Sequence, residues 1–144
     1  NKEFISYRNR IFKNNSYIFI KILSMMPFIK PFNKIIIKVE SLKQNIILNL
    51  FSDKLIYTDL NHDLSMSSES LHYILKNTFG FDTLTVNGCF DLGHKNGFIK
   101  ASKTLAIENL NNLGIYFNSK IFINLNIFKK FFNLLNKVKT NSNL

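Results

Sequence analysis

The fold is decided by residues 64–90, which read LSMSSESLHYILKNTFGFDTLTVNGCF. Ser67 is a suitable N-cap residue, and Glu69 lies in the first helical turn, where the helix dipole favours a negative charge. Gly80 is a residue type that often ends a helix. Apolar residues recur at helical spacing between these signals, which predicts a helix with one buried face: Leu71, Ile74, Leu75 and Phe79.

The residues after Gly80 alternate between apolar and polar types over two residues, which is the period of a half-covered strand. One side of this predicted strand carries Leu84, Val86, Gly88 and Phe90, and the other carries Thr83, Thr85, Asn87 and Cys89. Residues 64–90 therefore predict a strand, a helix and a second strand in that order.

The link between this helix and the second strand is unusually aromatic, with Phe79 and Phe81 on either side of Gly80. Two interpretations stay open: these rings close the mouth of an apolar pocket, or they pack in the core. The pocket, or a contact with another domain, would be lined by Leu71, Leu75, Phe79, Phe81, Leu84, Val86, Phe90 and Phe98. The residues expected to shape the motif are Ser67, Glu69, Gly80, Asp82, Asn87 and Gly88.

Upstream of this unit, the sequence predicts two amphipathic helices at residues 4–12 and 16–26. Pro27 and Pro31 then end the helical region. Three strands are expected at residues 35–40, 45–51 and 54–59, and their short spacing favours an antiparallel meander. The second strand is apolar on most of both faces, which is typical of a central strand or of one lining an apolar cavity.

Downstream, a loop is expected from Gly93 to Gly97, followed by one helix at residues 98–113 that Gly114 ends. Residues 115–117 are predicted as an edge strand, and residues 121–138 as a second amphipathic helix. The predicted fold class is α+β, with a mostly antiparallel sheet of four or five strands covered by helices. The expected organisation is a helical segment and linker (1–32), a sheet domain (33–117), and an amphipathic helix with a polar tail (118–144).

The basic balance of the chain comes almost entirely from lysine. The formal net charge is +10, from 17 Lys and 2 Arg against 9 Asp and Glu. Lys, Asn, Ile and Phe have AT-rich codons, and arginine is the residue that nucleic-acid recognition uses most, so nucleic acid is not an expected partner. The charge lies mainly at the ends, with +7 at residues 1–38 and +5 at residues 117–144. Such ends suit an acidic neighbouring domain or an anionic membrane surface, but solvated lysine faces are the favoured explanation.

The residues that carry chemistry are few and scattered. The single cysteine, Cys89, excludes an internal disulfide, fits a reducing cytoplasmic location, and is interpreted as structural. No metal-binding spacing surrounds His62, His72 or His94, and His62 with Asp63 is interpreted as a surface pair. A triad of Ser67 or Ser68 with His94 and an aspartate stays open, because triads form in space. No catalytic set, cofactor site, phosphate loop or membrane span is predicted for this chain.

Two parts of the central segment carry a resemblance: MSSESL at residues 66–71 and FGFDTLTVNGCF at residues 79–90. Together they resemble a segment that follows the catalytic domain in some bacterial metallo-β-lactamase-fold hydrolases. The layout of strands, Ser-capped helix and Val-Asn-Gly strand is also similar to sterol-carrier-protein-type domains. The first resemblance covers about 25 residues, and the second concerns only the architecture.

The first resemblance implies that the family's zinc-binding His-x-His-x-Asp-His motif lies upstream of Asn1, because the motif is absent from this sequence. The chain would then be the non-catalytic C-terminal part of a zinc-dependent hydrolase. The second resemblance implies a hydrophobic tunnel that accepts an apolar small molecule, or a face that packs on the catalytic domain or on a second copy. The alternative is a self-contained protein that binds lipid or a membrane surface through its basic amphipathic helices.

Overall fold

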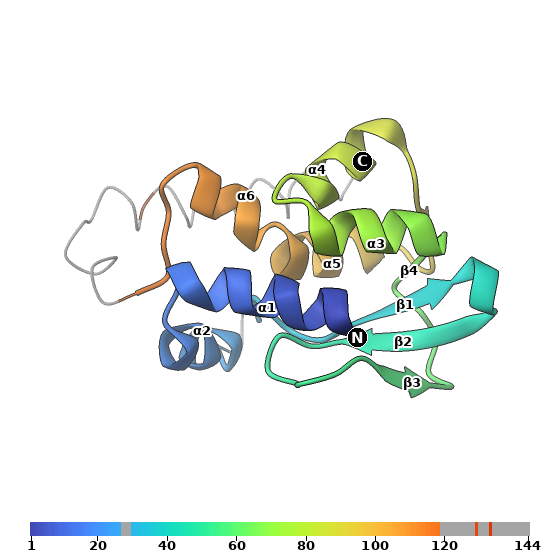
Figure 1. Cartoon of the computed structure of the whole chain (residues 1–144), viewed down its shortest axis with the longest axis horizontal. Coiled ribbons are helices and arrows are strands. Elements are labelled where there is room, and N and C mark those ends of the chain that lie inside the picture. The colour runs from blue at the N-terminus through green and yellow to red at the C-terminus, as the bar shows by residue number, and fades with distance from the viewer. Residues whose placement is uncertain (27–29, 119–128, 130–132, 134–144) are drawn as a thin grey trace.

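The computed structural model describes residues 1–26, 30–118, 129 and 133 (Figure 1). The helices are α1 (Lys2–Asn14), α2 (Tyr17–Ser24), α3 (Ser68–Lys76), α4 (Gly80–Asn87), α5 (Gly97–Leu105) and α6 (Ile107–Asn112), with a short 3-10 helix η1 (Glu40–Leu42). The strands are β1 (Ile35–Val39), β2 (Gln44–Leu48), β3 (Ile56–Thr58), β4 (Leu64–Met66) and β5 (Asp91–Leu92). This arrangement confirms the predicted α+β class.

The five strands form one sheet in the order β3-β2-β1-β4-β5. The first three strands make the predicted antiparallel meander, with Ile36 opposite Ile47 and Ile47 opposite Ile56. Strand β2 is an interior strand between β3 and β1, which agrees with one of the two interpretations of its apolar faces. Strand β4 pairs parallel to β1, and β5 pairs antiparallel to β4. The sheet is therefore mixed but mostly antiparallel, and β5 is a strand that the sequence did not predict.

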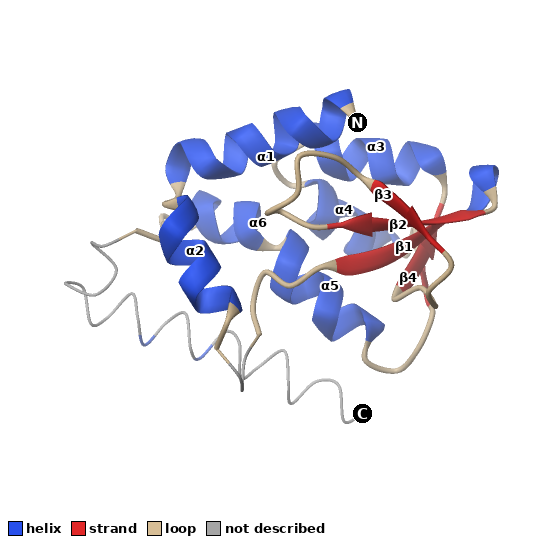
Figure 2. Cartoon of the chain, turned by 90° about the horizontal axis from the view of Figure 1, so that it is seen from below, coloured by secondary structure: helices blue, strands red, loops and turns tan. Residues whose placement is uncertain are grey.

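The hydrophobic core lies between one face of the sheet and the helices. Figure 2 shows α3 and α4 behind the strands and α1 above them. Strand pairing places alternate residues of β1, β2 and β4 on this face, because side chains along a strand alternate between faces. These buried residues are Ile35, Ile37, Val39, Ile46, Leu48, Leu64 and Met66. Helix α1 adds Phe4, Tyr7 and Ile11 to the same core. The core thus contains residues from both sides of the domain boundary predicted at residue 33. The boundary itself stays a prediction.

The two N-terminal helices are confirmed as α1 and α2. Ser16 separates them and caps α2, because its side chain accepts a hydrogen bond from the backbone N–H of Phe19. Arg8 connects α1 to the sheet region, since its Nε donates to the Leu50 carbonyl at 2.9 Å. Helix α1 is therefore an integral part of the described fold.

The predicted strand at residues 83–90 is wrong, because Gly80–Asn87 forms helix α4. Gly80 does not end α3 either, since α3 ends at Lys76 and Asn77 is its C-cap. A Cβ on Gly80 would lie 2.6 Å from the Ile74 Cα, so the missing side chain lets α4 start directly against the backbone of α3. Phe81 and Leu84 are then buried at helical spacing, whereas Val86 is 82% exposed. Packing against α3 overrides the β-type alternation of this segment.

Two predictions nearer the C-terminus are also corrected. The single helix expected at residues 98–113 is divided into α5 and α6 at Ala106, where ψ is 6°. Gly114 ends α6 as predicted, with a φ of +76°. Residues 115–117 form no strand: the Phe117 carbonyl accepts from Ser16 N–H, and the Phe117 N–H donates to Asn15 Oδ1. The predicted helix at residues 121–138 lies outside the described residues, apart from Lys129 and Asn133.

We expect Gly80→Ala to lower the free energy of unfolding by about 1–3 kcal/mol, because the new methyl group would overlap the α3 backbone. Gly88→Asn is the control, since Gly88 has a φ of +63° with nothing near its Cβ position, and asparagine tolerates this backbone. Urea unfolding followed by circular dichroism measures both variants. Equal unfolding midpoints for the two variants would contradict the close helix contact.

Candidate functional site

The carboxylate of Asp63 lies directly before β4 and is only 2% exposed. Its Oδ2 accepts the Ile36 N–H of β1 at 2.7 Å. Its Oδ1 lies 2.9 Å from His94 Nε2 and 2.9 Å from Lys100 Nζ. Because Lys100 belongs to α5 and His94 to the preceding loop, one carboxylate joins the sheet, the loop and a helix. The interpretation of Asp63 as part of a surface pair is therefore wrong.

The environment of Asp63 favours its ionised form. Burial alone would raise the pKa of this carboxyl, but the hydrogen bonds from Lys100, His94 and the Ile36 N–H together outweigh it. The pKa of Asp63 consequently lies below its ordinary value of 3.8. The carboxylate is thus negatively charged near neutral pH and is compensated by Lys100.

The ring of His94 has hydrogen-bond partners at both nitrogens. Nε2 faces Asp63, and Nδ1 accepts the Asn96 N–H at 3.2 Å. These two bonds are compatible with a neutral ring that carries its proton on Nε2. The structure thus unites two members of the triad considered from the sequence, His94 and an aspartate. Ser67 has other bonds, since its Oγ caps α3 by accepting the Ser70 N–H at 3.1 Å.

Two glycines permit the close approach of the His94 loop to Asp63. A Cβ on Gly97 would lie 2.1 Å from the Asp63 carbonyl oxygen, and one on Gly93 would lie 2.1 Å from the His62 carbonyl oxygen. The Gly93 N–H also donates to the Asp63 carbonyl at 3.0 Å. The sequence predicted a loop between these glycines, but it missed the buried aspartate that the loop surrounds.

A second buried ionic contact joins α1 to α6 and was also missed. The Arg10 guanidinium contacts both carboxylate oxygens of Glu108, and its Nη2 donates to the Leu75 carbonyl at 3.0 Å. Burial raises the pKa of Glu108, although Arg10 opposes this shift. Burial, with a smaller contribution from Glu108, also raises the pKa of Tyr7. The only signal in the sequence was Glu108 itself, an isolated acid within the helix predicted at residues 98–113.

The eight residues predicted to line an apolar pocket differ in burial in the structure. Leu71, Leu75, Phe81 and Leu84 are buried in the core, whereas Phe79 and Val86 are exposed. Phe90 and Phe98 are partly buried and pack with Phe81, at ring-centroid distances of 6.0–6.3 Å. Three nearly equal distances place the rings at the corners of a triangle rather than in a column. The structure thus brings together three of the eight residues as an aromatic cluster.

The predicted motif residues serve mainly at helix ends. Ser67 is confirmed as the N-cap of α3. The pKa of Glu69 is lowered by hydrogen bonds from the backbone N–H of Glu69 and from the side chains of Ser67 and Ser68. Gly88 ends α4 in the left-handed conformation. Asp82 lies in the first turn of α4, and Asn87 is the last residue of that helix. Cys89 is exposed, directly after the α4 cap.

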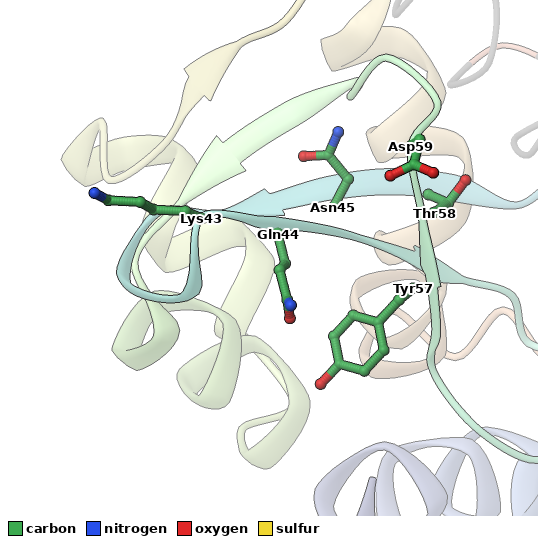
Figure 3. Close-up of a pocket in the computed structure, with 6 residues that line it drawn as sticks. All are labelled: Lys43, Gln44, Asn45, Tyr57, Thr58 and Asp59. Carbon is green, nitrogen blue, oxygen red and sulfur yellow. The ribbon is translucent and has the colours of Figure 1, made fainter.

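A groove of about 280 Å³ lies between the start of β2 and the end of β3 (Figure 3). Its lining residues are Lys43, Gln44, Asn45, Tyr57, Thr58 and Asp59. Figure 3 shows the side chains of Gln44 and Tyr57 on one side of the strands and those of Asn45 and Asp59 on the other. The groove therefore passes along the edge of the sheet, where β3 is the outermost strand.

Comparison with known proteins found no significant match to a protein-family model, a curated protein or a solved structure. Within the described residues, no group of three or more His, Cys, Asp or Glu side chains lies close enough to hold a metal ion. The assignment of a function therefore depends on the geometry above and on the sequence resemblance.

We expect Asp63→Asn to lower the free energy of unfolding by about 1–3 kcal/mol, because the amide nitrogen has no acceptor among the donors that surround this site. Asp53→Asn is the matched control: Asp53 pairs with Arg8 at 3.3 Å, but its side chain is 91% exposed. This control should change stability by less than about 0.5 kcal/mol. Urea unfolding near neutral pH compares the two, and similar small losses would contradict the structural role of Asp63.

The pKa shifts also predict a pH dependence. The pKa of Asp63 is lower in the folded chain, so the unfolded chain takes up this proton first as the pH falls. The stabilisation by Asp63 is present above its ordinary pKa of 3.8 and is lost as the pH falls through its folded value. The difference in the free energy of unfolding between wild type and Asp63→Asn should therefore shrink as the pH falls below 3.8 in a series of urea titrations. A difference that grows with acidification would contradict the assignment.

Proposed function

We propose that this chain is a non-catalytic accessory domain of a larger metallo-β-lactamase-fold hydrolase, and that it packs on the catalytic domain through the outer edge of its sheet. The observation that carries the proposal is the exposure of apolar side chains along β3 and directly after it. Ile56 is 44% exposed, Tyr57 is 67% exposed and Leu60 is 54% exposed. Ile56 and Tyr57 are consecutive in β3 and therefore lie on opposite faces of the strand, so together with Leu60 they border the open edge from both sides. We call these three residues the β3 edge surface.

The physical argument rests on the open edge of the sheet. Strand β3 is the terminal strand at this side, and no further strand of the described chain pairs with its outer edge. Native proteins usually protect such an edge, because its free backbone groups and apolar side chains invite association. A neighbouring domain that covers the edge would bury Ile56, Tyr57 and Leu60 and would fill the adjacent groove.

The non-catalytic part of the proposal is supported by the bonds of the polar residues. The Ser67 hydroxyl is used to cap α3, and both ring nitrogens of His94 have partners. Asp63 accepts hydrogen bonds from three separate parts of the fold. Ser67, His94 and Asp63 thus have structural partners, and the zinc chemistry would belong to the upstream domain that the resemblance implies.

An apolar ligand remains a secondary element of the proposal. Of the residues expected to line an apolar pocket, Phe90 and Phe98 are partly buried and pack against the core. The aromatic cluster with Phe81 would have to separate for a small apolar molecule to enter. The edge surface is accessible without such a change, so docking is the stronger part.

The first test is genetic and structural. We expect the reading frame upstream of the Asn1 codon to continue and to encode a His-x-His-x-Asp-His cluster. The encoded catalytic domain should then bind this chain in a calorimetric titration, and Ile56→Lys combined with Tyr57→Lys should weaken binding at least about tenfold, because two desolvated contacts are lost. A start codon beside Asn1 would contradict the proposal.

Leu113→Lys combined with Tyr116→Lys provides the matched control, since these side chains are 60% and 44% exposed but lie outside the β3 edge surface. Both double variants should unfold at the wild-type urea concentration, because exposed substitutions change stability little. If the edge variant instead converts a dimer of this chain into a monomer, the edge binds a second copy and the accessory role is wrong.

A further inference from the structure

Helix α2 exposes a continuous apolar face outside the β3 edge surface. Ile18 is 70% exposed, Ile22 is 59% exposed and the C-cap residue Met25 is 75% exposed. These residues follow one another at intervals of four and three positions, so they share one side of the helix. The opposite side is anchored in the core by Ile20 and Leu23.

The polar part of this face is cationic. At about 100° per residue, the exposed arc runs through Ile22, Ile18, Met25, Lys21 and Tyr17. Lys21 Nζ lies 5.7 Å from the centroid of the Tyr17 ring, so its ammonium group is next to the apolar residues. We call these five residues the α2 face. Its composition, three large aliphatic side chains beside an amphipathic tyrosine and a lysine, is typical of helices that lie at a membrane interface.

The stretch of sequence that contains α2 carries charge of one sign. No acidic residue occurs between Glu3 and Glu40, whereas this stretch contains seven Lys and Arg residues. Arg8, Arg10 and Lys38 are paired with carboxylates. The remaining four are exposed and have no carboxylate partner among the described residues: Lys13, Lys21, Lys30 and Lys34. Two of them flank α2 closely in the chain, since Lys13 precedes it and Lys30 follows it.

We propose that the α2 face binds an anionic membrane surface, with Ile18, Ile22 and Met25 inserted at the boundary of the acyl chains and the unpaired lysines against lipid phosphates. The charge selects this occupant, because a protein partner would have to supply several carboxylates around an aliphatic ridge, whereas an anionic bilayer supplies both features. No described helix is long and apolar enough to cross a bilayer. The proposed contact is therefore with the surface. It uses a different part of the fold from domain docking and does not depend on it.

The test uses the whole chain and sedimentation with vesicles of phosphatidylcholine alone or mixed with phosphatidylserine. We expect binding only to the mixed vesicles, and we expect it to weaken as salt is added. Lys21→Glu combined with Lys30→Glu should reduce the partition coefficient at least about 25-fold, since each lysine contributes about fivefold. Ile18→Ser combined with Ile22→Ser should reduce it about tenfold through the loss of apolar insertion.

Leu42→Ser combined with Lys43→Glu is the control, because it removes one exposed aliphatic side chain and one exposed cation at the far end of the β1–β2 hairpin (Figure 1). This control should bind like wild type, and all variants should keep the wild-type circular dichroism spectrum. Equal binding to both vesicle types, or equal losses in the control and the α2 variants, would overturn the proposal. So would the absence of vesicle binding together with a dimer that the α2 variants dissociate.

Discussion

The buried carboxylate of Asp63 is the constraint on which the arrangement of the described fold depends. An ionised group with 2% exposure is stable only if its hydrogen-bonding capacity is satisfied, because the loss of hydration is otherwise too costly. Here the donors come from β1, from the loop after β5 and from α5. The position of α5 against the sheet and the path of the loop follow from this one requirement. The glycines at positions 93 and 97 are needed for the same reason, since side chains there would separate the loop from Asp63.

Hydrophobic packing stabilises the fold, and the polar contacts select the arrangement of its elements. The inner face of the sheet is almost entirely aliphatic, and α1 covers part of it with two large aromatic side chains, Phe4 and Tyr7. The Arg10–Glu108 pair then fixes the position of α6 relative to α1 in a partly desolvated setting. Apolar burial is not directional, so contacts such as these select one arrangement among several of similar area.

The parts of the fold that could be predicted from the sequence are those governed by neighbouring residues. Two short runs rich in isoleucine specify the β1–β2 hairpin, Ser67 starts α3 and Gly114 ends α6, because strand preference and helix caps are local effects. Helix α4 was mistaken for a strand because its threonines and valine alternate, whereas its conformation depends on contact between Gly80 and a different helix. The candidate site was missed for a similar reason. Asp63 and His94 are 31 positions apart, and no local pattern indicates that they meet.

The way the two ends of the described fold are joined has a consequence for synthesis of the chain. The Asn15 side chain accepts the Phe117 N–H across 102 positions, and Arg10 meets Glu108 across 98. As the chain is synthesised from its N-terminus, Arg10 of α1 is made long before its partner Glu108, although Arg8 of the same helix meets Leu50 much earlier. Contacts of such long range slow folding, because loop closure must precede the gain in free energy. Until then the apolar side of α1 is a natural target for chaperones.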